Sequence, residues 1–339
     1  MRKTIVRVLV VLTVLAVGLG VVTVAGNDFR FTRREVTFGG PQGSLVGVLT
    51  EPRGGDARGL VVMVHGDGPV EATQGGLYSP WFEAAADAGF ATLSWSKPGV
   101  GRSAGDWLDQ SMADRAAEVD AALDWAHAQD DVPTGTVVLW AASQGGWVFP
   151  RVVADRDDVA GVVAVGTAVD WLRQGRFHLL AGLDDQGADD DERARAVAES
   201  DRVRDLLERG ASYDEYATTT PEADRMTRDR WGFVLRNVHA DATEGLRAMA
   251  PRGVPVHLMA GEHDRNVDIA ETERVYRDLL GDHVTVSTFD AVHSLARPVV
   301  EDVDVVGAVT AVVRPRALLA PGVLDDYRSA LASMGRRGW

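Results

Sequence analysis

Three side chains of the sequence have the types that nucleophilic catalysis requires, in the order serine, aspartate, histidine. Ser143 lies in the stretch LWAASQGGWV, between an apolar run and two glycines. Asp264 follows the apolar run VPVHLMAG, and His293 follows the next apolar run along the chain. A serine hydroxyl becomes a strong nucleophile when an imidazole takes its proton and a carboxylate fixes the imidazole tautomer. These three residues are therefore the candidate catalytic set, with Asp268 as the alternative acid.

Ser143 taken alone has two interpretations. The run TVVLWA before it predicts a buried strand, and a helix is predicted to begin after it. A serine at such a corner either caps the helix or projects its hydroxyl above the carboxyl edge of the sheet. Gly145 and Gly146 would let the turn approach neighbouring strands without a clashing Cβ. Asp264 and His293 also follow strands, and a parallel sheet gathers its site at that edge, which favours catalysis.

A second glycine-rich turn, HGDGP, follows the apolar run GLVVMV. A tetrahedral intermediate needs hydrogen-bond donors for its oxyanion, and the backbone N–H groups of Asp67 and Gln144 are the candidates. We interpret His65 as a structural residue that orients this turn. The carboxylate of Asp67 would repel an oxyanion, so it must turn away, bind a cationic group of the substrate, or be held by a neighbour.

The elements that must position these residues are short β-branched runs that alternate with alanine-rich amphipathic stretches from about residue 31 onward. Apolar runs such as GLVVMV predict strands buried on both faces of a parallel sheet. Helices are predicted near residues 81–88, 111–129 and 269–280, and the apolar stretch 299–313 is predicted to be the last helix packed on the sheet. We therefore expect an α/β fold with a mostly parallel central sheet and helices on both faces.

The alternation stops between about residues 167 and 250, where charged and aromatic stretches replace it. We predict a helical lid inserted at 167–250 into an α/β domain that spans 29–339. The acidic run at 189–192 is interpreted as a solvated loop or helix start rather than a metal site. Aromatic side chains in and near the lid indicate either an apolar substrate pocket or a packed lid core. The tentative substrate-binding residues are Trp147, Trp171 and Trp231.

The N-terminal segment 1–28 carries Arg2, Lys3 and Arg7, followed by an uncharged apolar run over residues 8–25. This length lies between that of a signal-peptide core and that of a membrane-spanning helix. Small residues at Thr23 and Ala25 would permit cleavage. We therefore predict a signal peptide or a transmembrane anchor, and a protein that is membrane-anchored or secreted.

Composition excludes several kinds of function. The net charge of −15 disfavours nucleic acid as a partner, because phosphate binding needs clustered cationic side chains. The chain has no cysteine, which excludes disulfides, thiolate catalysis and thiolate metal sites. Six histidines lack metal-like spacing with carboxylates, and of these His263, beside Asp264, is the one to keep in view. We expect no cofactor and no metal.

Together the motifs resemble those of the α/β-hydrolase superfamily, in particular its bacterial esterase-like branch near dienelactone hydrolases and prolyl-oligopeptidase-type serine hydrolases. The matching stretches span about residues 61–294 and are HGDGP, SWSKPGVGRS, SQGGW, GEHD and VHS. Two positions depart from the pattern, since Ala141 replaces the usual first glycine of the nucleophile motif and Asp67 replaces serine or glycine. In relatives the SWSKPGVGRS loop is structural, although Lys97 within it could instead line the pocket mouth.

The resemblance and the residues predict a serine hydrolase that cleaves carboxylic esters through an acyl-enzyme, with a small ester or acyl compound as its partner. An aminopeptidase, amidase or acyltransferase with the same three residues is the alternative, since Asp67 or the acidic lid would hold a substrate amine. A non-catalytic membrane-tethered binding protein on a hydrolase scaffold is the third reading, and the complete set of three residues argues against it.

Overall fold

The computed structural model describes residue 18 and residues 20–222 and 225–337. Its core is an eight-stranded sheet in the order β1-β2-β4-β3-β5-β6-β7-β8. β1 pairs antiparallel with β2, and β2 antiparallel with β4, whereas every other neighbouring pair is parallel. The strands are β1 (Phe31–Gly40), β2 (Gly43–Pro52), β3 (Gly59–Val64), β4 (Phe90–Trp95), β5 (Val137–Ala142), β6 (Val159–Val165), β7 (Val256–Gly261) and β8 (Val284–Phe289). This arrangement confirms the predicted α/β-hydrolase fold.

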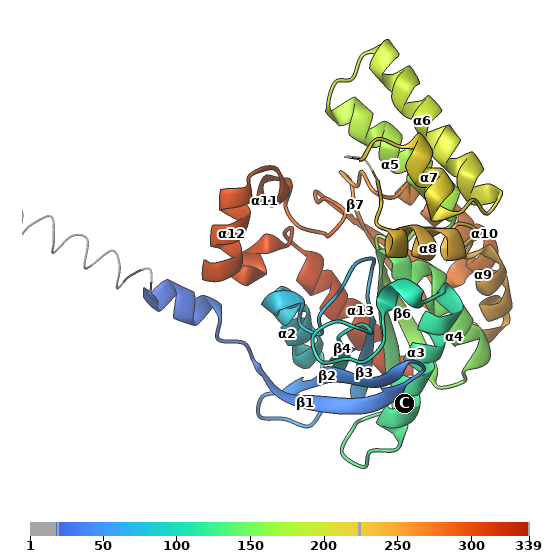
Figure 1. The fold of residues 1–339 in the computed structure, drawn as a ribbon. Coiled ribbons are helices and arrows are strands. Elements are labelled where there is room, and N and C mark those ends of the chain that lie inside the picture. Colours follow the sequence, from blue (N-terminus) through green and yellow to red (C-terminus); the bar gives the residue numbers. More distant parts are fainter. Residues whose placement is uncertain (1–17, 19, 223–224, 338–339) are drawn as a thin grey trace, which may run out of the picture.

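The central strands are buried on both faces, as their unbroken apolar runs predict. In β3 every residue is buried. Alternate side chains of β3 enter different cores, since Val61 and Met63 pack with α2 and α13, whereas Val62 and Val64 pack with α3 and α4. The sheet therefore lies between two helical layers (Figure 1).

The helices begin and end close to the predicted positions. Those of the α/β body are α2 (Ser79–Asp87), α3 (Met112–His127), α4 (Phe149–Asp155), α10 (Ile269–Leu280) and α13 (Val323–Arg337). α3 starts at a capping box, in which Ser111 and Asp114 each bind the backbone N–H of the other. This local signal explains why the sequence predicts the start of α3 well.

A run of helices separates β6 from β7. It contains α5 (Trp171–Asp185), α6 (Asp190–Glu208), α7 (Tyr213–Thr219), α8 (Arg228–Asn237) and α9 (Thr243–Met249). Figure 1 shows α5, α6 and α7 extending beyond the α/β body, while α8 and α9 lie against it. The acidic run at 189–192 is a helix start, because Asp189 caps α6 and forms a capping box with Glu192.

The prediction for the apolar stretch 299–313 is wrong. It forms two short helices, α11 (Pro298–Asp302) and α12 (Asp304–Val313), with no residue of either buried. The last helix on the sheet is α13, whose Tyr327, Leu331 and Met334 are buried against the central strands. The prediction rests on the apolar composition of the stretch, but the fold leaves most of the valines of α11 and α12 exposed to solvent.

The N-terminal prediction falls mostly on residues 1–17 and 19, which lie outside the described residues. Residues 20–26 are helical and lead into β1. None of the helices in the described part of the chain combines the length and the apolar character needed to cross a membrane.

Candidate active site

Ser143 occupies a strained turn between β5 and a short 3-10 helix, η3 (Ser143–Trp147). Its φ of 48° lies in the left-handed region, which costs a non-glycine residue energy and is maintained by the surrounding structure. The turn is pressed against its neighbours, because a Cβ on Gly145 would lie 2.8 Å from the Val64 carbonyl oxygen. A Cβ on Gly146 would lie 2.8 Å from the Thr167 Cβ. The two glycines thus allow the close approach that the sequence predicts.

His293 and Asp264 are brought together from the loops after β8 and β7. The Nδ1 of His293 lies 2.8 Å from Oδ2 of Asp264, whose side chain is only 1% exposed. The other carboxylate oxygen accepts the backbone N–H groups of Asn266 (2.8 Å) and Val267 (2.9 Å). A carboxylate held in this way favours the imidazole tautomer with its proton on Nδ1, which leaves Nε2 as the basic nitrogen.

The two remaining candidates near this loop have other partners. Asp268 caps α10 by accepting the backbone N–H of Glu271 (3.1 Å). His263 pairs with Asp290 at the surface, with 2.8 Å between Nε2 and Oδ1. Asp264 is therefore the acid that meets His293, and His263 takes no part in that contact.

Ser143 and His293 line the same cavity, which has a volume of about 550 Å³. The residues of its wall come mostly from the segment after β3 and from the segment 294–319, and they are largely apolar. They include Val70, Leu77, Tyr78, Trp81, Trp140, Val165, Ala296, Val300, Pro315, Leu318 and Leu319. In the described part of the chain, Asp67 is the single acidic residue of this wall. The cavity is therefore suited to an apolar group beside Ser143.

The predicted substrate-binding tryptophans do not line this cavity, so that prediction is corrected. Trp147 is buried, donates its Nε1–H to the Val169 carbonyl (2.8 Å) and stacks on Trp171 at 5.0 Å between ring centroids. Trp231 is buried and stacks on Tyr216 at 4.1 Å. These rings form the packed core of the helical insertion and its seam with α4. The environments of the three tryptophans therefore agree with the alternative interpretation, a packed lid core.

Two buried basic side chains, Lys97 and Arg115, bind backbone carbonyls of the turn that follows β3. Lys97 Nζ donates a hydrogen bond to the carbonyl of Gly66, and Arg115 donates one to the carbonyl of His65. The carbonyl of Gly66 and the N–H of Asp67 belong to one trans peptide, so they point in opposite directions. Lys97 therefore fixes the direction of the Asp67 N–H. Burial, and after it the charge of Arg115, hold the pKa of Lys97 well below its usual value.

The carboxylate of Asp67 is held by a neighbour. Arg230 of α8 donates from both terminal nitrogens, at 3.0 Å and 2.5 Å, to the two carboxylate oxygens. Gln144 Nε2 lies 3.3 Å from the same carboxylate, and its Oε1 accepts from Arg115 at 2.6 Å. Burial opposes ionisation of Asp67, but the hydrogen bonds and charge of Arg230 outweigh it, so the pKa of Asp67 lies below its usual value.

His65 has the structural environment that the sequence predicts. Its Nε2 lies 2.9 Å from the Trp95 carbonyl, and its ring stacks on Tyr78 with a centroid separation of 5.5 Å. Burial, followed by the charges of Lys97 and Arg115, lowers the pKa of His65 to about 3. A neutral ring that is stacked and bound to backbone supports the turn and is not poised as a base.

Arg230 and Arg115 are not predicted from the sequence, and for Lys97 the structure supports the structural interpretation of its loop over the alternative at the pocket mouth. Arg230 reaches the site from the insertion, and no spacing in the sequence connects it to Asp67. Arg115 lies on α3 and is buried, which is unusual for arginine and has no marker in the sequence. Lys97 is 2% exposed and stands behind the turn, so it does not line the pocket mouth.

Comparisons with known proteins agree with this architecture. A family model described as "Serine aminopeptidase, S33" matches residues 55–297. An esterase of Pyrococcus furiosus superposes with a TM-score of 0.55 at 14% identity, covering 91% of each chain. An α/β-hydrolase of Penicillium has a TM-score of 0.52 at 16% identity, covering 85% of this chain and 99% of its own. At these identities the structural likeness concerns the fold. A search of curated proteins finds no match.

Proposed function

This chain belongs to the serine aminopeptidase S33 family of α/β-hydrolases, and we propose that it is a serine hydrolase that cleaves carboxylic esters with an apolar acyl group. The observation that carries the proposal is the pairing of His293 with the buried Asp264, beside Ser143 in its strained turn. This combination supplies a nucleophile, a base whose Nδ1 is bound to Asp264 so that Nε2 is the basic nitrogen, and a fixed acid, which is the set that acyl transfer needs.

In the proposed reaction, the Ser143 Oγ attacks the ester carbonyl carbon while the Nε2 of His293 takes the hydroxyl proton. Asp264 stabilises the imidazolium. The negatively charged oxygen of the tetrahedral intermediate accepts hydrogen bonds from the backbone N–H groups of Gln144 and Asp67. When the intermediate collapses, the bond to the alcohol breaks and His293 protonates the departing oxygen. Water, deprotonated by His293, then attacks the acyl-enzyme and releases the acid and free Ser143.

The charges around the cavity favour an ester over a substrate with a free amine. An aminopeptidase must bind an ammonium group, and the candidates for that contact are Asp67 and the acidic lid, whose acidic run at 189–192 does not line the cavity. The two carboxylate oxygens of Asp67 are already paired with Arg230, which neutralises the charge. With no other acidic residue in the described wall of the cavity, an ammonium group would be desolvated without compensation.

A comparison of substrates tests the proposal. The purified protein is assayed with p-nitrophenyl esters and with aminoacyl anilides, and we expect faster turnover of the esters. Faster turnover of the anilides would overturn the ester assignment in favour of a peptidase. A fluorophosphonate probe tests the nucleophile separately, because it should label the protein but not Ser143→Ala. Equal labelling of the two would sink the role of Ser143.

A further inference from the structure

One face of α12 exposes a row of valines to solvent. Val305, Val309 and Val312 are 71%, 55% and 63% exposed. Their spacing of four and three residues places them on the same side of the helix. Val299 of α11 and Val303 before α12 are also exposed. Contiguous apolar side chains of this kind mark surfaces that contact another apolar phase or partner.

The N-terminal segment enters the structure directly beside this face. Asn27 donates from Nδ2 to the carbonyl of Val312 at 2.8 Å. A Cβ on Gly26 would lie 2.1 Å from the carbonyl oxygen of Val313, so the two backbones are in close contact. Figure 1 shows the N-terminal helical residues on the same side of the molecule as α12. Val21 and Val24 of that helix are exposed as well.

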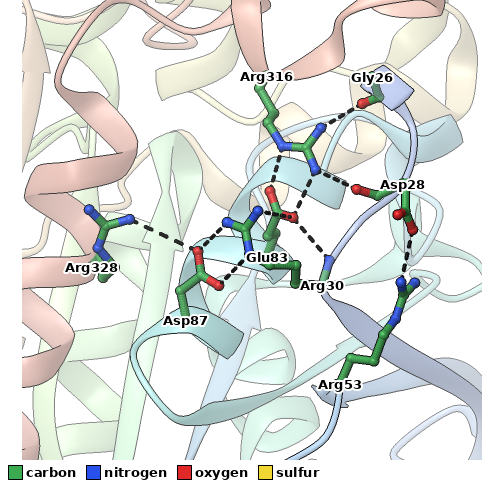
Figure 2. Close-up of polar contacts among 8 residues, drawn as sticks. All are labelled: Gly26, Asp28, Arg30, Arg53, Glu83, Asp87, Arg316 and Arg328. Carbon is green, nitrogen blue, oxygen red and sulfur yellow. Dashed lines mark hydrogen bonds and ion pairs between the residues drawn. The ribbon is translucent and has the colours of Figure 1, made fainter. Parts of the chain in front are cut away.

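Arg316, just after α12, fixes this juncture (Figure 2). It donates to the carbonyls of Gly26 at 2.6 Å and of Asp28 at 2.8 Å, and it pairs with Glu83 of α2 at 2.5 Å. Glu83 is buried, with a side chain 4% exposed, and also accepts the backbone N–H of Arg30 at 2.9 Å. The end of the N-terminal segment, the chain just after α12 and the α/β body are thus joined by one partly buried ion pair and its hydrogen bonds.

The same segment of chain forms part of the wall of the cavity. Val300 of α11 and Pro315 and Leu318, which follow α12, line the space that contains Ser143 and His293. A surface that contacts the exposed side of α11 and α12 therefore lies beside the segment that carries Val300, Pro315 and Leu318 of the cavity wall. An apolar substrate leaving this surface would reach Ser143 along an apolar wall.

We propose that the valine face of α11 and α12, together with the described N-terminal helix at residues 20–26, binds the surface of a phospholipid bilayer and turns the cavity toward it. The ten residues of α12 extend about 15 Å, which is too short to span a bilayer but is suited to lying in its interface. The composition of the neighbouring chain favours a bilayer as the partner of the valine face. Residues 8–17, which precede the described helix, are all uncharged and mostly apolar. A second copy of the chain is the competing occupant that the experiment must exclude.

The absence of cysteine allows a site-specific test. Val309→Cys, labelled with an environment-sensitive fluorophore in the full-length chain, is reconstituted with phosphatidylcholine vesicles that contain a lipid-attached quencher. Zwitterionic lipid is chosen because Glu301, Asp302 and Asp304 lie at the α11–α12 junction, where anionic headgroups would be repelled. Ala198→Cys on α6, which is exposed and distant in sequence from the face, is the matched control.

With vesicles we expect the emission at position 309 to shift to shorter wavelength and to be quenched, while the label at position 198 is unchanged. Equal emission and quenching at the two positions would overturn the proposal, whether or not the N-terminal segment holds the chain on the vesicle. So would a shift at position 309 that appears without vesicles and grows with protein concentration, because a second copy would then cover the face.

A second arm concerns substrate delivery and rests on the proposed ester hydrolysis. The variant V305S/V309S/V312S should hydrolyse a short water-soluble ester like the parent chain but lose turnover of a long-chain ester embedded in the vesicles. Equal loss on both esters, or no loss on either, would contradict delivery from the bilayer. If the parent chain hydrolyses neither ester, the proposed function fails, while the fluorescence result still decides the bilayer contact.

Discussion

Arg230, on a helix of the insertion, forms a two-pronged ion pair with Asp67, on the turn that follows β3. The insertion therefore reaches the proposed oxyanion site through one charged contact, while its tryptophans pack elsewhere. The pair also explains how an aspartate can occupy this turn beside the proposed oxyanion site. The guanidinium cancels a charge that would otherwise oppose the developing oxyanion.

Removal of Arg230 should harm catalysis through Asp67. We expect Arg230→Met to lower kcat for a p-nitrophenyl ester by about 10- to 100-fold, because an unpaired carboxylate next to the oxyanion costs about 1–3 kcal/mol of transition-state stabilisation. The double variant Arg230→Met/Asp67→Asn should recover most of the loss, since it removes the charge as well. Steady-state kinetics of the four combinations measures this coupling. A double variant as slow as Arg230→Met would show that Arg230 acts by other means.

Lys97 is expected to act as a positioning residue. In Lys97→Met the Gly66 carbonyl loses its donor, so the peptide that carries the Asp67 N–H is free to rotate. We predict a fall in kcat of about 10-fold or more with little change in KM, because the oxyanion is bound only in the transition state. Steady-state kinetics at constant pH, with kcat and KM determined separately for the variant and the parent chain, measures this effect. A variant that raises KM and keeps kcat would instead place Lys97 in ground-state binding.

The contact between Asp264 and Nδ1 of His293 predicts the effect of Asp264→Asn. An amide at this position would donate to Nδ1 and so favour the wrong tautomer of His293, and kcat should fall by about 10³- to 10⁴-fold. The variant Asp268→Asn is a matched control, because that side chain caps α10 and touches no part of the site. Its kcat should stay near that of the parent chain. If Asp268→Asn were the more damaging change, Asp264 would lose its assigned role.

The lowered pKa of buried His65 leads us to expect that the free energy of unfolding depends on pH. Its pKa is about 3 in the folded chain and near 6.5 in the unfolded chain, so between these values the unfolded state binds the proton more readily. Stability should therefore decrease as the pH falls below 6.5, by about 2 kcal/mol between pH 7 and pH 5 from this group alone. Urea unfolding at the two pH values measures it. His65→Gln should be less stable at pH 7 but show a smaller decrease.

The apolar wall of the cavity predicts chain-length selectivity. Leu318→Trp adds volume next to Ser143 and should lower kcat/KM for long acyl esters by about 10-fold or more relative to acetate. Trp231→Phe, in the core of the insertion, should change the unfolding midpoint and leave the chain-length profile alone. An acyl-chain series with both variants distinguishes the wall of the cavity from the packing of the insertion. If only Trp231→Phe changed the chain-length profile, Trp231 rather than Leu318 would contact the acyl chain.

The features that the sequence predicts well are those with a local signal. Strands buried on both faces appear as continuous apolar runs, the start of α3 is marked by a capping box, and Ser143 stands between a strand and two glycines. Asp264 and His293 are predictable as neighbours because both follow strands of one parallel sheet, whose ends converge. Chain order and strand ends thus suffice to predict the proximity of these side chains.

Features set by distant contacts could not be predicted in this way. Nothing in the stretch around Arg230 indicates that it meets Asp67, which is 163 residues earlier in the chain. For Trp147, Trp171 and Trp231 the sequence allows both a substrate pocket and a packed lid core, because aromatic side chains are common in both, and only the packing separates the two. The valines of α12 were assigned to the sheet because hydrophobicity predicts burial, while the competition from α13 for the same surface is a property of the whole fold.

The contacts of Arg316 determine where a truncated chain should begin. An expressed chain that starts at Gly26 would keep both backbone carbonyls that Arg316 binds, as well as the ion pair between Asp28 and Arg53. A chain that starts at Phe29 would lose all of them, so that the residues before the first strand would keep only the contacts of Phe29 and Arg30, while the strand itself stays paired with β2. Three residues thus separate a chain whose start is held by Arg316 from one whose start is expected to fray.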